Sequence, residues 1–207
     1  MPKVKKTSNP SDTRQKLLDA AAEVFAELGY HRATIREITR RAGASVALVN
    51  YHFRDKSELY IELLRRLAEE AKNVIPGEEV LIGPPEQQLR RFVGQFLTRA
   101  LDPAKPQWRR QIFAREIAQP SAGFEIVLEM TRPLYDRLGR IVTAIAGKPL
   151  PPRAVALHTA SILGQCLYYI EHRAIIHAVQ PGLADYDHVP DICEHISATT
   201  LAAIRSN

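Results

Sequence analysis

Residues 34–56 read TIREITRRAGASVALVNYHFRDK, and this stretch decides the fold. Thr34 and Glu37 form a capping box, in which the threonine hydroxyl caps the Glu37 N–H and the glutamate side chain can reach back. Gly43 follows after two helical turns and tolerates the positive φ of a tight turn. Ser45 is a second N-cap, from which another short helix starts. The stretch therefore predicts two short helices joined by a tight turn.

Apolar residues recur at helical spacing in both short helices. They are Ile35, Ile38 and Ala42 in the first helix, and Val46, Val49 and Phe53 in the second. The two helices therefore have a packing reason to cross, and Phe25 and Leu28 of a preceding helix would hold the second one in place. Two short crossed helices have the geometry of a helix-turn-helix, whose second helix enters the major groove of DNA.

The exposed face of the second short helix supplies the candidate base contacts. Small residues there would let the helix approach base edges, and Asn50 can pair with adenine through two hydrogen bonds. The helix N-termini at Thr34 and Ser45 offer free N–H groups to phosphates. Arg36 and Lys56 add positive charge beside the DNA backbone, and Arg36 could also reach a base. The predicted DNA-contacting residues are Thr34, Arg36, Ser45, Val46, Ala47, Leu48, Asn50, Tyr51, His52 and Lys56.

The remaining periodicity predicts an all-α fold, in which the helix-turn-helix head precedes a larger helical body. A first helix is expected from Asp12 to Leu28 with Gly29 as its C-terminal cap, and a fourth helix begins near Asp55. Further helices are expected over 86–101, 107–118, 122–146, 152–179 and 188–204. Pro133 lies inside the third of these and either kinks or splits it. The expected domains are a disordered basic arm (1–10), a DNA-binding domain (11–56), a connecting helix (57–75), a linker (76–85) and the body (86–207).

The charge distribution sets the N-terminal segment apart. The chain has a formal net charge of +5, and residues 1–56 carry all of this excess. A basic segment ahead of a neutral body favours a polyanion partner, although a solvated basic tail would give the same count. No apolar run approaches the ~20 residues of a membrane span, and no apolar stretch follows the basic start as in a signal peptide. With only Cys166 and Cys193 as thiols, we expect a cytoplasmic protein.

A spaced pattern extends over residues 12–64. It comprises Leu17-x-x-Ala20, Phe25-x-x-x-Gly29-Tyr30, Thr34-x-x-x-Ile38, Ala42-Gly43-x-Ser45 and Val49-Asn50-Tyr51-His52-Phe53-x-x-Lys56-x-x-Leu59. The pattern resembles the DNA-binding domain of TetR-family regulators. The resemblance implies that residues 46–48 and 50 read bases, and that Thr34, Tyr51, His52 and Lys56 hold phosphates. Many members have an aromatic residue in place of Asn50, which leaves open whether Asn50 reads a base or bonds a phosphate. Tyr51 and His52 could also be half-buried packing residues.

Three stretches of the body are Arg115-Glu116-x-Ala118-x-Pro120, Arg132-Pro133 and Gly164-Gln165-Cys166-Leu167-Tyr168-Tyr169. They resemble the effector and dimer domain of a CecR-like subgroup of the same family, which implies that residues 86–207 bind a small, often apolar or aromatic molecule. The aromatic residues of the middle helices independently allow such a pocket, although each could be a core residue. The predicted effector-contacting residues are Phe92, Phe96, Trp108, Phe113, Arg115, Glu116, Phe124, Met130 and Tyr135. Arg115 and Glu116 point in different directions, so each either pairs elsewhere or faces the cavity.

The last two helices are predicted to form a dimer interface. His158, Gln165 and His172 are seven residues apart and share a helical face, beside Ile162 and Tyr169. A mixed polar and aromatic face is better explained by a partner helix than by solvent. The predicted interface residues are His158, Ile162, Gln165, Tyr169, His172, Ile192, Ile196 and Thr199. A two-fold dimer would match a palindromic operator with half-sites about 34 Å apart or somewhat more.

These features predict a homodimeric regulator of transcription that an effector releases from double-stranded operator DNA. Repression is the expected mode, although activation stays open. Whether one dimer or a pair of dimers binds the DNA also stays open. An enzyme is a first alternative, but Cys166 and His172 lie on different helical faces and Cys193-Glu194-His195 lacks a zinc-type spacing. No phosphate loop or nucleophile motif is present, so no catalytic residue, cofactor or metal is predicted. A ligand-binding protein that has lost DNA binding is a second alternative, against which the intact caps argue.

Overall fold

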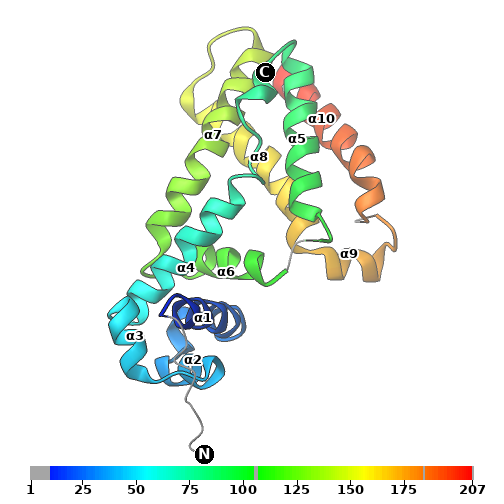
Figure 1. Ribbon diagram of the computed structural model, residues 1–207. Coiled ribbons are helices and arrows are strands. Elements are labelled where there is room, and N and C mark those ends of the chain that lie inside the picture. Colours follow the sequence, from blue (N-terminus) through cyan, green and yellow to red (C-terminus); the bar gives the residue numbers. More distant parts are fainter. Residues whose placement is uncertain (1–9, 105–106, 184, 207) are drawn as a thin grey trace, which may run out of the picture. The chain divides into compact units, whose positions relative to one another are not determined.

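The computed structural model describes residues 10–104, 107–183 and 185–206, and every regular element in these ranges is a helix (Figure 1). The elements are α1 (Pro10–Arg32), α2 (Ile35–Ala42), α3 (Val46–Phe53), α4 (Lys56–Ala71), η1 (Glu78–Leu81), α5 (Pro85–Leu101), α6 (Gln107–Ala118), α7 (Phe124–Ala146), α8 (Pro152–Glu171), α9 (Arg173–Val179), η2 (Tyr186–His188) and α10 (Val189–Arg205). The predicted all-α fold class is confirmed. None of the described helices is both long and apolar enough to cross a membrane.

The chain divides into two compact units. The head unit comprises Met1–Glu70 and Pro106–Glu129, and the body unit comprises Ala71–Lys105 and Met130–Asn207. The head unit therefore contains α6 and the beginning of α7 in addition to the four N-terminal helices. Each unit has its own apolar core.

The turn between α2 and α3 forms as its sequence predicts. The backbone of Thr34 is extended, and its hydroxyl accepts the Glu37 N–H at 3.2 Å. Gly43 ends α2 in the left-handed conformation (φ 62°, ψ 33°), which glycine adopts without strain because it has no Cβ. Two predicted details are wrong. The Glu37 carboxylate binds the guanidinium groups of two arginines that follow it, and Ser45 precedes α3 without a side-chain cap bond.

The core of the head unit joins its first four helices to one that comes much later in the chain. Phe25 of α1, Val49 of α3 and Leu59 of α4 are buried in one apolar cluster. Ile112 of α6 is buried in the same cluster, and α6 packs against α1 (Figure 1). Residues 107–118 were expected among the helices of the body, because their apolar spacing does not show which core they enter.

The core of the body unit lies among α5, the later part of α7, α8 and α10. The segment 76–85, expected as a linker, contains η1, whose Val80 is buried in this core. Glu78 of η1 also forms ion pairs with Arg137 and Arg140 of α7 at 3.1 and 2.8 Å. The segment is therefore packed against the body. Helix α7 runs through Pro133 without being split, whereas the helix expected over 152–179 is divided at His172.

The connection between α3 and α4 contains a backbone conformation that is strained for most residues. Arg54 has φ 66° and ψ −57°, and it is the only non-glycine residue with positive φ in the described ranges. The Asp55 N–H donates to the Phe53 carbonyl at 2.8 Å, which closes a three-residue γ-turn around Arg54. The Asp55 carboxylate then caps α4 by accepting the Glu58 N–H at 2.9 Å.

We expect Arg54→Gly to raise the free energy of unfolding by about 1 kcal/mol, because the relief of strain exceeds the entropy that glycine adds to the unfolded chain. The matched control is Arg65→Gly at an exposed position inside α4, which should lower the same free energy by about 1 kcal/mol. Urea unfolding of both variants measures the two effects. Equal destabilisation by the two substitutions would show that the turn at Arg54 is unstrained.

Candidate nucleic-acid interface

Helix α3 has one face in the core of the head unit and one face in solvent. Val49 and Phe53 are buried, whereas Ala47 and Asn50 are exposed. Val46 was assigned both to the apolar spacing and to base contact, and its side chain is 44% exposed. The spacing of buried positions therefore leaves a continuous outer face, on which four of the predicted DNA-contacting residues lie. These are Val46, Ala47, Asn50 and Tyr51.

Leu48 and His52, on either side of this face, are half-buried, whereas Tyr51 on the face is exposed. Leu48 is half-buried and packs against the core of the head unit. Tyr51 is 79% exposed, so the alternative that it is a half-buried packing residue is wrong. His52 is half-buried, and its ring meets that of Tyr51 edge-on with 4.9 Å between centroids. His52 therefore supports Tyr51 from the side.

Two arginines of α2 are held by carboxylates within the head unit. The Glu37 carboxylate accepts hydrogen bonds from Arg40 at 2.7 Å and from Arg41 at 2.9 Å. These two guanidinium groups lower the pKa of Glu37 to about 2. Arg41 also binds Glu27 of α1 at 2.6 Å, which joins α2 to α1. Arg36 lies on the same helix with its side chain exposed.

Lys56 has a structural role that sequence analysis missed. Its ammonium group donates to the carbonyl oxygens of Tyr30 at 3.0 Å and Ala33 at 3.2 Å, and it lies 4.4 Å from the centroid of the Tyr30 ring. These contacts hold the turn that follows Gly29, where α1 is interrupted (φ 72°, ψ 167°), directly before the N-cap of α2. Two of the three N–H groups of Lys56 are thereby used, and its contact with a phosphate stays a prediction. The sequence did offer one signal of this role. A helix that ends at Gly29 leaves backbone carbonyls without helical partners, and a lysine can bind them.

The residues predicted to contact an effector are divided between the two units. Phe92, Phe96, Met130 and Tyr135 belong to the body unit, and Trp108, Phe113, Arg115, Glu116 and Phe124 belong to the head unit. Phe92 and Phe96 are buried and stack on each other in the core of the body unit. Both charged members pair elsewhere, because Glu116 binds Tyr60 and Ser121, and Arg115 donates to the Glu27 carbonyl.

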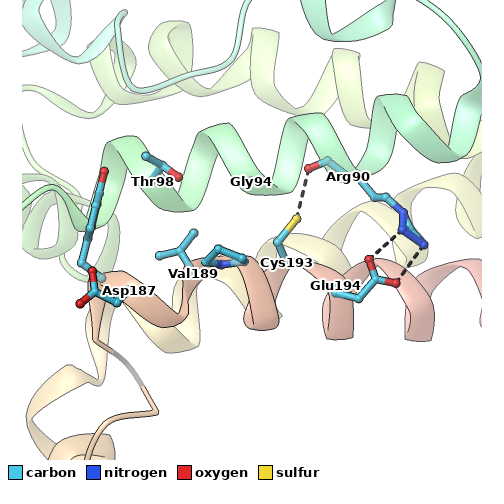
Figure 2. A pocket seen from close by; sticks show the side chains of 9 residues that line it. Arg90, Gly94, Thr98, Asp187, Val189, Cys193 and Glu194 are labelled. Atoms are coloured by element: carbon cyan, nitrogen blue, oxygen red, sulfur yellow. Dashed lines mark hydrogen bonds and ion pairs between the residues drawn. The ribbon is translucent and has the colours of Figure 1, made fainter.

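Three open hollows lie at the surface of the described part of the body unit. Figure 2 shows one of about 520 Å³ between α5 and α10, where Arg90 pairs with Glu194 at 2.7 Å and the Cys193 thiol donates to the Arg90 carbonyl. Burial raises the pKa of the Cys193 thiol, which makes it a poor nucleophile at neutral pH. The second hollow, of about 840 Å³, lies along α7 and α8 and is lined by Tyr135 and Thr159. The third, of about 470 Å³, is lined by Leu157 and His158. Tyr135 is the one predicted effector residue that lines any of these three hollows.

The predicted dimer residues need correction. Ile162, Ile192 and Ile196 are buried in the core of the body unit, so their side chains are not available to a partner. His158, Gln165 and Tyr169 are half-buried, and His172 and Thr199 are exposed. The exposed stripe of α8 consists of Leu157, Ala160, Gly164 and Tyr168. The predicted face is wrong because apolar residues of α8, such as Ile162, pack in the chain's own core.

Two parts of the chain match known protein families. Residues 17–63 match the family model of bacterial regulatory proteins, tetR family, and residues 85–204 match that of the C-terminal domain of the HTH-type transcriptional dual regulator CecR. The HTH-type transcriptional regulator BetI of Escherichia coli (strain K12) is 35% identical over 83 residues, which are 39% of this chain and 43% of BetI. The chain thus matches less than half the length of this curated relative.

Solved structures resemble the whole chain. A putative transcriptional regulator from Pseudomonas aeruginosa PAO1 has a TM-score of 0.68 at 17% identity, with 97% of this chain and 95% of that chain covered. The transcriptional regulator FadR from Bacillus subtilis, solved in complex with stearoyl-CoA, has a TM-score of 0.63 at 15% identity, with 91% and 97% covered. HlyIIR, a hemolysin II transcriptional regulator, has a TM-score of 0.61 at 23% identity, with 91% and 99% covered. At these identities the likeness establishes the fold.

We expect Lys56→Met to lower the free energy of unfolding by about 1–2 kcal/mol, because the Tyr30 and Ala33 carbonyls lose a charged donor while the apolar stem is kept. The control is Lys16→Met, which removes an exposed ion pair with Asp12 and should cost less than about 0.5 kcal/mol. Thermal unfolding of the two variants distinguishes them. If the two costs are equal, Lys56 does not hold the turn.

Proposed function

We propose that this chain, which belongs to the TetR family of bacterial regulatory proteins and carries a CecR-type C-terminal domain, is a homodimeric repressor that a small molecule releases from a palindromic operator. The observation that carries the proposal is the outer face of α3. Its side chains are exposed although the helix is anchored from behind by Val49 and Phe53. A short helix fixed in this way can enter a major groove without rearranging the core.

The chemistry of the outer face suits base reading. The amide of Asn50 can pair with adenine through two hydrogen bonds, in which its N–H donates to N7 and its oxygen accepts from the N6 amino group. Val46 and Ala47 are small and apolar, so they allow close approach and contact with a thymine methyl group. Tyr51 lies exposed at the next position and can donate its hydroxyl to a phosphate. The proposed assignment is therefore base contact for residues 46, 47 and 50, and backbone contact for Tyr51 and Arg36.

A second copy of the chain is the proposed partner of α8. Leu157 and Tyr168 are 63% and 50% exposed, and Ala160 and Gly164 lie between them at helical spacing. Small residues between large apolar ones let two helices approach closely, and exposed apolar stripes of this kind mark protein interfaces. The corresponding outer positions of α10, His195, Ala198 and Ala202, are exposed as well. A two-fold axis through these helices would place two α3 helices on one palindrome.

The body unit is the proposed place of effector binding. Its core includes the stacked rings of Phe92 and Phe96, which suit an apolar or aromatic ligand. Within the described part of the chain, buried Gln95 Oε1 and the hydroxyls of Thr159 and Thr200 have no hydrogen-bond partner. Buried polar atoms are normally paired, and Thr159 lines the hollow along α7 and α8, so a polar group of a ligand there would pair with its hydroxyl. Release from DNA requires that the effector binds the DNA-incompetent state more tightly.

We expect Asn50→Ala to relax the sequence preference at one or two positions of each half-site, because the amide is the most specific base-reading group on the outer face. Selection from a library of random duplexes by the wild-type protein and the variant measures this preference. The control is Asn73→Ala, an exposed asparagine in the body unit, which should leave the selected consensus unchanged. An unchanged consensus with Asn50→Ala would rule out a base contact.

We expect Gly164→Arg to raise the dimer dissociation constant by about 100-fold, because a two-fold interface would bury the charge twice and without a partner. A Cβ at Gly164 meets no atom within 4 Å in the single chain, so the fold itself accommodates the change. The control is Gln87→Arg, an exposed residue of α5. Sedimentation at several concentrations measures the constant, and wild-type values for Gly164→Arg would place the interface elsewhere.

A further inference from the structure

Glu116 of α6 is a buried carboxylate with three neutral donors. Only 1% of the surface of Glu116 is exposed. The Tyr60 hydroxyl donates to Oε2 at 2.8 Å, the Ser121 hydroxyl donates to Oε2 at 2.7 Å, and the Ser121 N–H donates to Oε1 at 2.7 Å. Removing a carboxylate from water costs free energy, which an apolar residue in the same volume would not. The carboxylate is buried here because it accepts these three hydrogen bonds. The three bonds therefore define a specific join between α6, α4 and the start of the α6–α7 connection.

Arg115, the preceding residue, grips a different helix. Its guanidinium donates to the Glu27 carbonyl in α1 at 3.3 Å. It also lies against Gly29, where a Cβ would stand 3.4 Å from Arg115 Nη1. Adjacent residues on a helix point in different directions, so one dipeptide of α6 holds both α1 and α4. We call Arg115 and Glu116 the α6 clamp.

Tyr60 connects the α6 clamp to the helix-turn-helix. Its ring lies 4.6 Å from that of Phe25 and 4.9 Å from that of Tyr30, measured between centroids. Burial and the hydrogen bond to Glu116 raise the pKa of Tyr60, so its hydroxyl stays a donor at neutral pH. The Tyr30 carbonyl in turn accepts from Lys56, which also binds Ala33, the residue before the N-cap of α2. Contacts thus run without a gap from α6 to the first residue of the helix-turn-helix.

We propose that Arg115 and Glu116 are positioning residues for DNA binding, which hold α1 and α4 so that α2 and α3 stand in the orientation that fits the major groove. The inference rests on the proposed function, and neither residue lies on the outer face of α3. Arg115 and Glu116 were expected in the body, but they belong to the head unit, and the proposal gives them a role there.

The test compares four full-length single variants and one double variant with the wild-type protein on duplexes that the wild-type protein selects from a random library. Tyr60→Phe removes the hydrogen bond from α4, Glu116→Gln leaves one acceptor oxygen for three donors, and Arg115→Met removes the join to α1. The matched control is Glu125→Gln, an exposed glutamate of α7 in the same unit. Dissociation constants are measured well below each melting temperature and at several salt concentrations.

We expect the three clamp variants to bind the selected duplex about tenfold more weakly, within the range seen for residues that act through others. The salt slope should stay at its wild-type value because no phosphate contact is lost. The double variant of Glu116→Gln and Tyr60→Phe should bind no more weakly than the weaker of the two single variants, since both substitutions act on the same group of hydrogen bonds. Glu125→Gln should bind as the wild type does.

A lower melting temperature with an unchanged dissociation constant would overturn the inference, because the clamp would then serve stability alone. If Glu116→Gln does not fold, Tyr60→Phe, which lacks a single hydroxyl, decides in the same way. Failure of the wild type and of Glu125→Gln to select any sequence would instead refute the proposed function, and the clamp with it. Wild-type selection with unaffected clamp variants refutes only the clamp.

Discussion

Burial of Val49 and Phe53 in the core of the head unit is the constraint on which the rest of the account depends. Each such side chain contributes about 1.5–3 kcal/mol when removed from water, which is enough to fix the rotation of a helix of only eight residues. The rotation decides that Val46, Asn50 and Tyr51 face outward. A short helix has little intrinsic stability, so its orientation comes from this packing and not from propensity.

The positive charge of the head unit is divided between holding the fold and facing solvent. Arg40 and Arg41 are bound by carboxylates, and Lys56 is bound by two carbonyl oxygens. The net positive charge of the N-terminal quarter is therefore an upper limit on the charge that is available to DNA phosphates. Arg36 lies exposed beside the N-terminus of α2, where free N–H groups add to its attraction for phosphate. A site arranged in this way combines a rigid frame with a small number of available charges.

Local features could be predicted from the sequence, and partners distant in the sequence could not. The cap at Thr34, the turn at Gly43 and the break at Gly29 depend on residues within four positions, and all three are as expected. The spacing of α6 gives an amphipathic helix but does not show that Ile112 enters the core of the head unit. The same limit explains Ile162, because the faces of α8 toward its own core and toward solvent both carry apolar residues. The outer face of α3 could be predicted from the sequence because the two buried residues that define it, Val49 and Phe53, are only about one helical turn apart.

The most direct test of the central claim is selection of genomic fragments by the purified wild-type protein at near-physiological salt, followed by sequencing of the retained DNA. The account predicts a palindrome whose half-sites lie about one helical turn apart or somewhat more, about 34 Å, since two copies of α3 would read it. Retention of fragments with no shared motif, at the affinity of random DNA, would contradict the account. The outer face of α3 would then be an ordinary solvated surface on a basic helical protein.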